Sequence, residues 1–170
     1  MNVKFLNPFV EAAFEVIRTE TGCQLSRGEI GLQKDPYQTE DITVIISLIG
    51  AVEGNVFYSM SADTGRYLAG QILGEPVEEF DMLAQSGIAE LGNVITGQAS
   101  IKLCKSGYES TISPPALLLG KGATISTLDY VRLTVPMSGK CGTIVIHLAL
   151  REGRDKNFST ARVPVAPMKI

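Results

Sequence analysis

The spacing of apolar residues predicts two long amphipathic helices. In the first, apolar positions recur at helical spacing behind Asn7 and Pro8, a capping side chain followed by a residue preorganised for the first helical turn. We therefore expect a helix over residues 3–20, or one that starts at Pro8. A longer helix is expected from Glu79 to Lys105, because this window contains no proline and keeps the 3.6-residue period.

Runs rich in β-branched and aromatic residues predict the strands. These runs cover residues 41–50, 55–60, 116–119, 128–135 and 143–150. The stretch from Gly50 to Gly54 is expected to connect the first two strands, and residues 137–140 should form the turn of the last hairpin. A shorter helix should follow the second predicted strand, residues 55–60. It should be capped by Ser61 or Asp63 and ended by the glycine and proline of Gly74-Glu75-Pro76.

The predicted elements combine into an α+β fold. The links between strands are short, which favours antiparallel pairing. We expect a single domain, a largely antiparallel sheet with long helices packed on one face, built on a chain of 170 residues that is 45% hydrophobic. This domain should span residues 1–150, and residues 151–170 should form a flexible or loosely docked tail because they are polar and proline-containing.

Composition excludes several classes of function. A formal net charge of -3 gives no basic field for nucleic acid. The longest apolar run, residues 42–52, is too short to cross a bilayer as a helix, and the N-terminus lacks the features of a signal peptide. Three widely spaced cysteines and one histidine predict neither a disulfide framework nor a zinc site. We expect a cytoplasmic protein without a metal site and without membrane or nucleic-acid partners.

The long helix also carries a polar stripe. On a helical wheel its apolar side chains share one broad face, which we expect to be core: Leu83, Ala84, Ile88, Leu91, Val94, Ile95 and Ile101. Ser86, Glu90, Asn93 and Gly97 fall on a different, narrow stripe, since spacings of three and four bring side chains above one another. Asparagine and glycine inside a helix each cost up to about 1 kcal/mol relative to alanine, so a function is a reasonable motive for the stripe. From these residues alone, an ordinary solvated helix face remains the simpler interpretation.

The residues from Ser86 to Asn93 resemble the S/D-x-x-x-E-x-x-N signature of the CheC/CheX/FliY phosphatase family. The helix opening Asn7-Pro8-Phe9 and the spacing from Gly50 to Gly54 are also similar to that family. The resemblance covers about residues 1–150, and the single copy of the motif makes it closer to CheX than to CheC. The family pattern has its following proline one or two positions beyond Pro114-Pro115, a departure that concerns the connection after the helix and not the motif.

The resemblance implies a phosphatase that removes the phosphoryl group from an aspartyl-phosphate on a CheY-like response regulator. It makes Glu90 and Asn93 the catalytic pair: Asn93 would orient the attacking water, and Glu90 would pair with a lysine of the partner. Ser86 and Gly97 would contact the partner. No cofactor of the chain's own is expected, since the phosphorylated response regulator supplies Mg²⁺. The resemblance also implies a homodimer.

Two other functions stay open. The chain could be a non-catalytic adaptor that binds a receiver domain in a chemotaxis or two-component pathway, or a small-molecule binding domain with an apolar pocket. Other candidate residues have simpler explanations. His147 lies in an apolar run and is expected to be structural, Cys104 is expected to be a packing residue, and the glycines around Lys121 lack the spacing of a phosphate loop. The acidic cluster over residues 75–81 fits a helix N-terminus better than a metal site.

Overall fold

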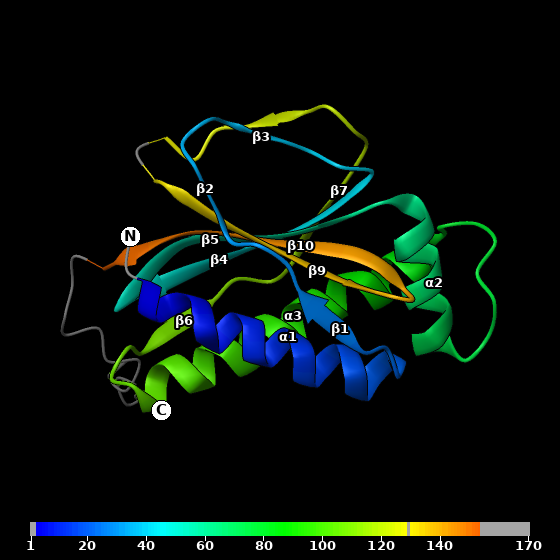
Figure 1. Ribbon diagram of the computed structural model, residues 1–170, viewed down its shortest axis with the longest axis horizontal. Coiled ribbons are helices and arrows are strands. Elements are labelled where there is room, and N and C mark those ends of the chain that lie inside the picture. Colours follow the sequence, from blue (N-terminus) through cyan, green and yellow to red (C-terminus); the bar gives the residue numbers. More distant parts are fainter. Residues whose placement is uncertain (1–2, 129, 154–170) are drawn as a thin grey trace, which may run out of the picture.

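The fold has two layers, a large antiparallel sheet and a layer of helices on one of its faces (Figure 1). The computed structural model describes residues 3–128 and 130–153 of the chain. Its helices are a short 3-10 helix, Val3–Phe5, followed by α1 (Leu6–Thr21), α2 (Ala62–Leu73) and α3 (Met82–Lys105). The α+β class, the antiparallel sheet and the helices packed on one face are as predicted from the sequence.

The strands pair only with antiparallel neighbours within the described residues. They are β1 (Leu25–Arg27), β2 (Gly31–Gln33), β3 (Tyr37–Gln38), β4 (Ile42–Gly50), β5 (Val52–Met60), β6 (Ser110–Ile112), β7 (Ala116–Leu119), β8 (Thr124–Ile125), β9 (Arg132–Gly139) and β10 (Gly142–Glu152). The main sheet has the order β1-β9-β10-β5-β4-β6, with β2 also on β9 and β7 also on β4. The long strands β4, β5, β9 and β10 therefore form its centre.

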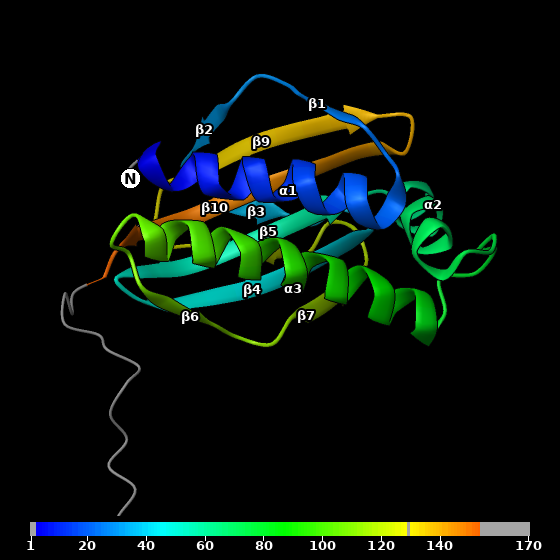
Figure 2. The same cartoon turned by 90° about the horizontal axis from the view of Figure 1, so that it is seen from below.

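The helices are arranged so that one long helix stays open to solvent along one side. Helices α1 and α3 run side by side across the sheet, and α2 lies at one end of it (Figure 2). Helix α3 contacts α1, α2 and strand β4. No other helix of the described residues lies over the side of α3 that points away from the sheet in this view.

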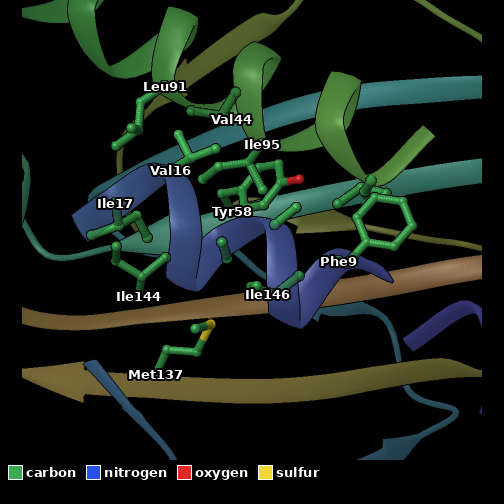
Figure 3. Close-up of a cluster of buried hydrophobic side chains, with 14 of the residues drawn as sticks. Phe9, Val16, Ile17, Val44, Tyr58, Leu91, Ile95, Met137, Ile144 and Ile146 are labelled. Carbon is green, nitrogen blue, oxygen red and sulfur yellow. The ribbon is translucent and has the colours of Figure 1, made fainter. Parts of the chain in front are cut away.

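The hydrophobic core lies between the helices and the sheet. Phe9 and Ile17 of α1, Ile95 of α3, and Tyr58 and Ile144 of the sheet are all buried there (Figure 3). Alternate residues of β4 belong to this cluster, which is the two-residue period of a strand with one face on the core. The core thus holds α3 against the sheet along its inner side.

A small second sheet, β3 with β8, lies over the opposite face of the main sheet (Figure 1). Tyr37 of β3 stacks on Phe57 with ring centroids 5.6 Å apart and lies 4.5 Å from the ring of His147. Arg132 lies 5.4 Å from the same tyrosine ring. This face is therefore covered by an aromatic and polar cluster, and the helices are absent from it.

Several predicted helix boundaries are confirmed, and one cap is wrong. Ser61 caps α2 by accepting a hydrogen bond from Thr64 N, and Gly74 ends α2 with a φ of 75°. Asn7 does not cap α1: the helix already begins at Leu6, and the capping position is Phe5, which makes no side-chain cap hydrogen bond. The preceding 3-10 turn supplies the start of the helix in place of a side chain.

The strand predictions succeed for the long strands and fail for the short ones. Strands β4, β7 and β10 match predicted runs, whereas β1, β2, β3, β6 and β8 were not predicted. Strand β5 contains its predicted run but already starts at Val52, so most of the stretch from Gly50 to Gly54, expected to be a connection, belongs to the two strands. The run predicted over residues 128–135 is displaced, because β9 starts at Arg132 and continues through Pro136, whose carbonyl accepts a hydrogen bond from Gly28 N (2.8 Å). The hairpin turn consequently lies at Lys140 and Cys141, later than predicted.

The folded part of the chain continues beyond residue 150, the predicted domain boundary. Strand β10 runs to Glu152, and Gly153 N donates a hydrogen bond to Ala51 O over 2.9 Å. The remainder of the predicted tail, residues 154–170, lies outside the described residues. No helix in the described part of the chain is both long and apolar enough to cross a membrane.

Candidate functional site

Helix α3 carries the candidate site, and local interactions fix its two ends. The Asp81 side chain caps it by accepting a hydrogen bond from Ala84 N at 2.9 Å. The acidic stretch before α3 therefore provides a helix cap. Within the described ranges, no group of three or more acidic, histidine or cysteine residues is placed to hold a metal ion. Lys102 and Lys105 lie in the last turn, where cations favourably meet the helix dipole.

The inner side of α3 packs closely on the sheet at Gly92. A Cβ atom at this position would lie 2.9 Å from Val44 Cγ1 and 3.3 Å from Tyr58 Cδ2, so the close approach of helix and strand requires glycine. One turn later, Thr96 donates a hydrogen bond to Gly92 O (2.8 Å) and lies 2.8 Å from the Tyr58 hydroxyl. Both side chains are buried, and burial raises the pKa of Tyr58 well above its usual value.

The predicted core face of α3 is correct in its middle and wrong near its ends. Ala84, Ile88, Leu91 and Ile95 are buried and Val94 is partly buried. Leu83 and Ile101 are exposed, by 58% and 51%. Their angular positions place them beside Glu90 and not above the sheet, so their apolar character did not indicate burial.

The four stripe residues lie together on the outer side of α3. Ser86 and Glu90 are exposed, while Asn93 and Gly97 are half-buried. The helix that carries them is continuous from Met82 to Lys105, so the spacings of four, three and four residues bring them into one row. The structure therefore brings together all four residues that the sequence singled out.

Glu90 and Asn93 contact each other directly. Asn93 Nδ2 donates a hydrogen bond to Glu90 Oε2 over 3.3 Å. Glu90 forms no ion pair with the described residues, so its carboxylate is available to a cation from outside the chain. Since the Asn93 amide nitrogen is engaged with Glu90, its oxygen remains available to accept a hydrogen bond.

The two ends of the stripe differ from its centre. Ser86 Oγ donates to Met82 O of the preceding turn (2.8 Å), so this hydroxyl proton is already used within the helix. Gly97 has open space around it: a Cβ atom there would find only Ile112 Cδ1, at 4.0 Å. The fold does not require glycine at position 97, in contrast to position 92.

The other candidates lie apart from the stripe. His147 is on β10, and its Nε2 lies 2.9 Å from Ser59 Oγ. Burial and the nearby Arg132 lower the pKa of His147 to about 3, so the ring is neutral and structural, as predicted. Cys104 is exposed near the end of α3, which differs from the packing role expected for it.

Sequence reasoning missed the residues that support the site. Gly92 stands at an unspecified position of the motif, and its role depends on Val44 and Tyr58, which are distant in the sequence. The signal that was available is the pair Gly92 and Thr96, a small residue followed one turn later by a small polar one on the inner side of a long helix. Its meaning depends on which strand lies beneath.

Comparisons with known proteins point to one family. The family model described as "Chemotaxis phosphatase CheX" matches residues 42–138, a segment that runs from β4 to β9 and includes all of α3. Among curated proteins, the CheY-P phosphatase CheX of Thermotoga maritima is 27% identical over 139 residues, which covers 81% of this chain and 89% of that protein.

Two solved structures share the fold over most of the chain. A CheC-like superfamily protein from Shewanella sp. PV-4 is 28% identical with a TM-score of 0.80, covering 89% of this chain and 99% of that one. CheX in the CheX-CheY-BeF3-Mg²⁺ complex from Borrelia burgdorferi is 29% identical with a TM-score of 0.73, covering 89% and 100%. With more than half of its length matched by the family model, and with the motif helix inside the match, the chain belongs to the chemotaxis phosphatase CheX family.

Proposed function

We propose that this protein hydrolyses the aspartyl-phosphate of a CheY-like response regulator, with Asn93 and Glu90 as the residues that act on it. The observation that carries the proposal is the pair of hydrogen-bonded side chains on the outer side of α3, where Glu90 is exposed and Asn93 is half-buried. Family membership supports the reaction, and the two CheX relatives named above are a CheY-P phosphatase and a protein in complex with CheY.

The reaction needs orientation more than covalent chemistry. Water attacks phosphorus, the bond from phosphorus to the aspartate oxygen breaks, and the products are inorganic phosphate and the free carboxylate. Because phosphoryl transfer has a loose transition state, an enzyme accelerates it mainly by positioning and charge stabilisation. The free oxygen of the Asn93 amide would accept a hydrogen bond from the attacking water and hold it in line with phosphorus.

Glu90 would have two tasks. Its carboxylate accepts the hydrogen bond from Asn93 and so fixes which way the amide points. It would also pair with a lysine of the response regulator, which draws α3 onto the phosphorylated surface. Ser86 and Gly97, above and below the pair, would lie under loops of the partner, where the missing side chain of Gly97 permits close approach.

The chain would contribute no metal or cofactor of its own. The phosphorylated response regulator would supply the Mg²⁺, which neutralises charge on the phosphoryl group. We also propose that the phosphatase works in the cytoplasm.

We also propose that the protein forms a homodimer through an edge of its sheet. Leu32 on the edge strand β2 is 64% exposed, and an antiparallel edge can be extended by a second copy. Light scattering coupled to gel filtration measures the mass directly. A monomer at all concentrations would contradict the dimer without affecting the proposed reaction.

The decisive experiment measures phosphate release from a phosphorylated CheY-like receiver with Mg²⁺. Wild type should accelerate release, and Asn93→Ala should lower kcat by about 10²-fold or more, because the oriented water is lost. Gln98→Ala is the matched control, since Gln98 is another exposed amide on α3 that lies off the stripe. Wild type that binds the receiver without accelerating release would make the protein an adaptor and contradict the proposal.

A further inference from the structure

The outer side of α3 exposes large apolar side chains at both ends of the stripe. Among the described residues, nine large apolar side chains are exposed, and three of them belong to this one helix: Met82 (82%), Leu83 (58%) and Ile101 (51%). Single exposed apolar residues are common on protein surfaces and need no explanation. Their position relative to Glu90 and Asn93 is what gives these three a meaning.

Leu83, Glu90 and Ile101 form a straight row along the helix. They are separated by seven and eleven residues, which are close to two and three whole turns, so their side chains fall within about 20° of one another around the axis. At 1.5 Å per residue the two apolar residues lie about 10 Å before and 16 Å after Glu90. The row is about 27 Å long, the width of a standard protein interface.

The fold itself gives no reason for apolar residues at these two places. The inner side of the same helix already supplies the core with Ala84, Ile88, Leu91 and Ile95. More than half of each of Leu83 and Ile101 remains in water. A glutamine would keep the helix equally well at either position, since its helix propensity is close to that of leucine and better than that of isoleucine.

We propose that Leu83 and Ile101 are the apolar anchors by which α3 docks on the phosphorylated receiver, one on each side of the catalytic pair. The inference rests on the proposed function, because the receiver is identified by its reaction with Asn93. The partner surface must then carry a cation opposite Glu90 and an apolar depression on either side of the aspartyl-phosphate.

This division of tasks follows from the chemistry of the centre. Glu90 and Asn93 must stay polar to orient water, so they cannot also supply burial of apolar area, which is the main source of affinity in protein complexes. Anchors at a distance supply that affinity without adding charge near the phosphoryl group. They contact neither the attacking water nor phosphorus, and they therefore select the receiver without taking part in hydrolysis.

The test separates binding from chemistry. Leu83→Gln and Ile101→Gln should each raise KM for the phosphorylated receiver about tenfold with kcat within twofold of wild type, as expected when binding common to ground and transition state is lost. The control is Ile49→Gln, because Ile49 is 60% exposed on β4 and points away from the helices. This variant should leave both parameters unchanged.

A second measurement keeps the inference distinct from the proposed function. Affinity for the receiver charged with beryllofluoride and Mg²⁺ is measured for the same variants, with circular dichroism to check folding. Suppose that wild type is active. If KM is then unchanged in both Leu83→Gln and Ile101→Gln, or if Ile49→Gln raises KM by as much as they do, the anchoring role is overturned and the proposed function is not. If wild type binds without turnover, the proposed function fails, and the anchors stand only if Leu83→Gln and Ile101→Gln weaken binding. No binding by wild type overturns both.

Discussion

The side-chain amide of Asn93 donates a hydrogen bond to the carboxylate of Glu90 over 3.3 Å, so the two residues of the motif are connected before any partner arrives. The spacing of three residues produces this contact, since it places one side chain a turn below the other. An amide that is held by one atom presents its other atom in a defined direction. Glu90 therefore preorganises Asn93 in addition to any role at the interface.

The two tasks of Glu90 can be separated by removing its charge and keeping its shape. Glu90→Gln retains an oxygen that accepts from Asn93, so kcat should stay within a few-fold of wild type. The loss of the ion pair should raise KM several-fold and weaken its dependence on salt, because screening no longer affects this contact. Steady-state kinetics between low and high ionic strength measure both. A large loss of kcat with unchanged KM would contradict the anchoring role.

Two glycines of α3 should respond in opposite ways to alanine. Gly92→Ala should destabilise the protein by about 1–3 kcal/mol, because the new methyl group would press on Val44 and Tyr58. Gly97→Ala should stabilise it by about 0.5–1 kcal/mol, since its surroundings are open and alanine favours a helix. Urea unfolding measures both changes.

Gly97→Ala should also lower kcat/KM for the phosphorylated receiver if position 97 lies under a loop of the partner. Greater stability with lower activity would then mark a glycine kept for the partner and not for the fold. Activity that stays at the wild-type level would contradict this role while leaving the stability prediction intact.

The buried hydroxyl pair beneath the stripe predicts an asymmetry between two small changes. Tyr58→Phe should cost about 1 kcal/mol, because Thr96 keeps its hydrogen bond to Gly92 O. Thr96→Val should cost more, about 1–3 kcal/mol, because it leaves the Tyr58 hydroxyl buried without its partner. Chemical unfolding of the two variants gives the order, and equal costs would argue against this hydrogen-bonding arrangement of the pair.

The lowered pKa of His147 predicts that the folded protein loses stability in acid. Its pKa is about 3 in the folded protein and near 6.5 when unfolded, so below pH 6.5 the unfolded chain takes up a proton that the folded chain does not. The free energy of unfolding should therefore fall as the pH drops from 6.5 toward 3, by up to about 1.4 kcal/mol per pH unit from this residue.

The test compares wild type with His147→Gln, which can still donate to Ser59. Urea unfolding at pH 7.5 and pH 4.5 should show a difference between the two pH values that is about 2–3 kcal/mol smaller in the variant. Equal differences in both proteins would show that His147 titrates normally in the fold. Other groups cancel, since they are common to both proteins.

How far the sequence leads depends on whether a feature is local. The caps at Ser61 and Gly74 and the row from Ser86 to Gly97 depend on residues within a few turns, and the structure contains all of them. The strands that escaped prediction are all two or three residues long, and they exist because of partners far along the chain, as β3 does with β8. No short segment of the sequence contains both strands of such a pair.

The same reason explains the errors on α3. Hydrophobicity gives the free energy that a side chain would gain by burial, whereas the neighbouring elements decide whether it is buried. In the described part of the chain, Leu83 and Ile101 remain more than half exposed. For the candidate site, spacing was sufficient to group Glu90 with Asn93. It could not reveal their hydrogen bond, nor the closeness of Gly92 to Val44, which depends on the layer beneath.

Helix α3 packs on the sheet with one side and faces solvent with the other, and this has a consequence for how related sequences can diverge in evolution. Substitutions along the outer row alter no contact of the core, so new receiver preferences can accumulate without a loss of folding free energy. Meanwhile the inner side of α3, where Gly92 permits close packing on Val44, keeps the distance between the helix and β4 constant. Paralogous signalling pairs in one cell could thus be insulated from one another, and synthetic pairs engineered, by rewriting a single exposed row of residues.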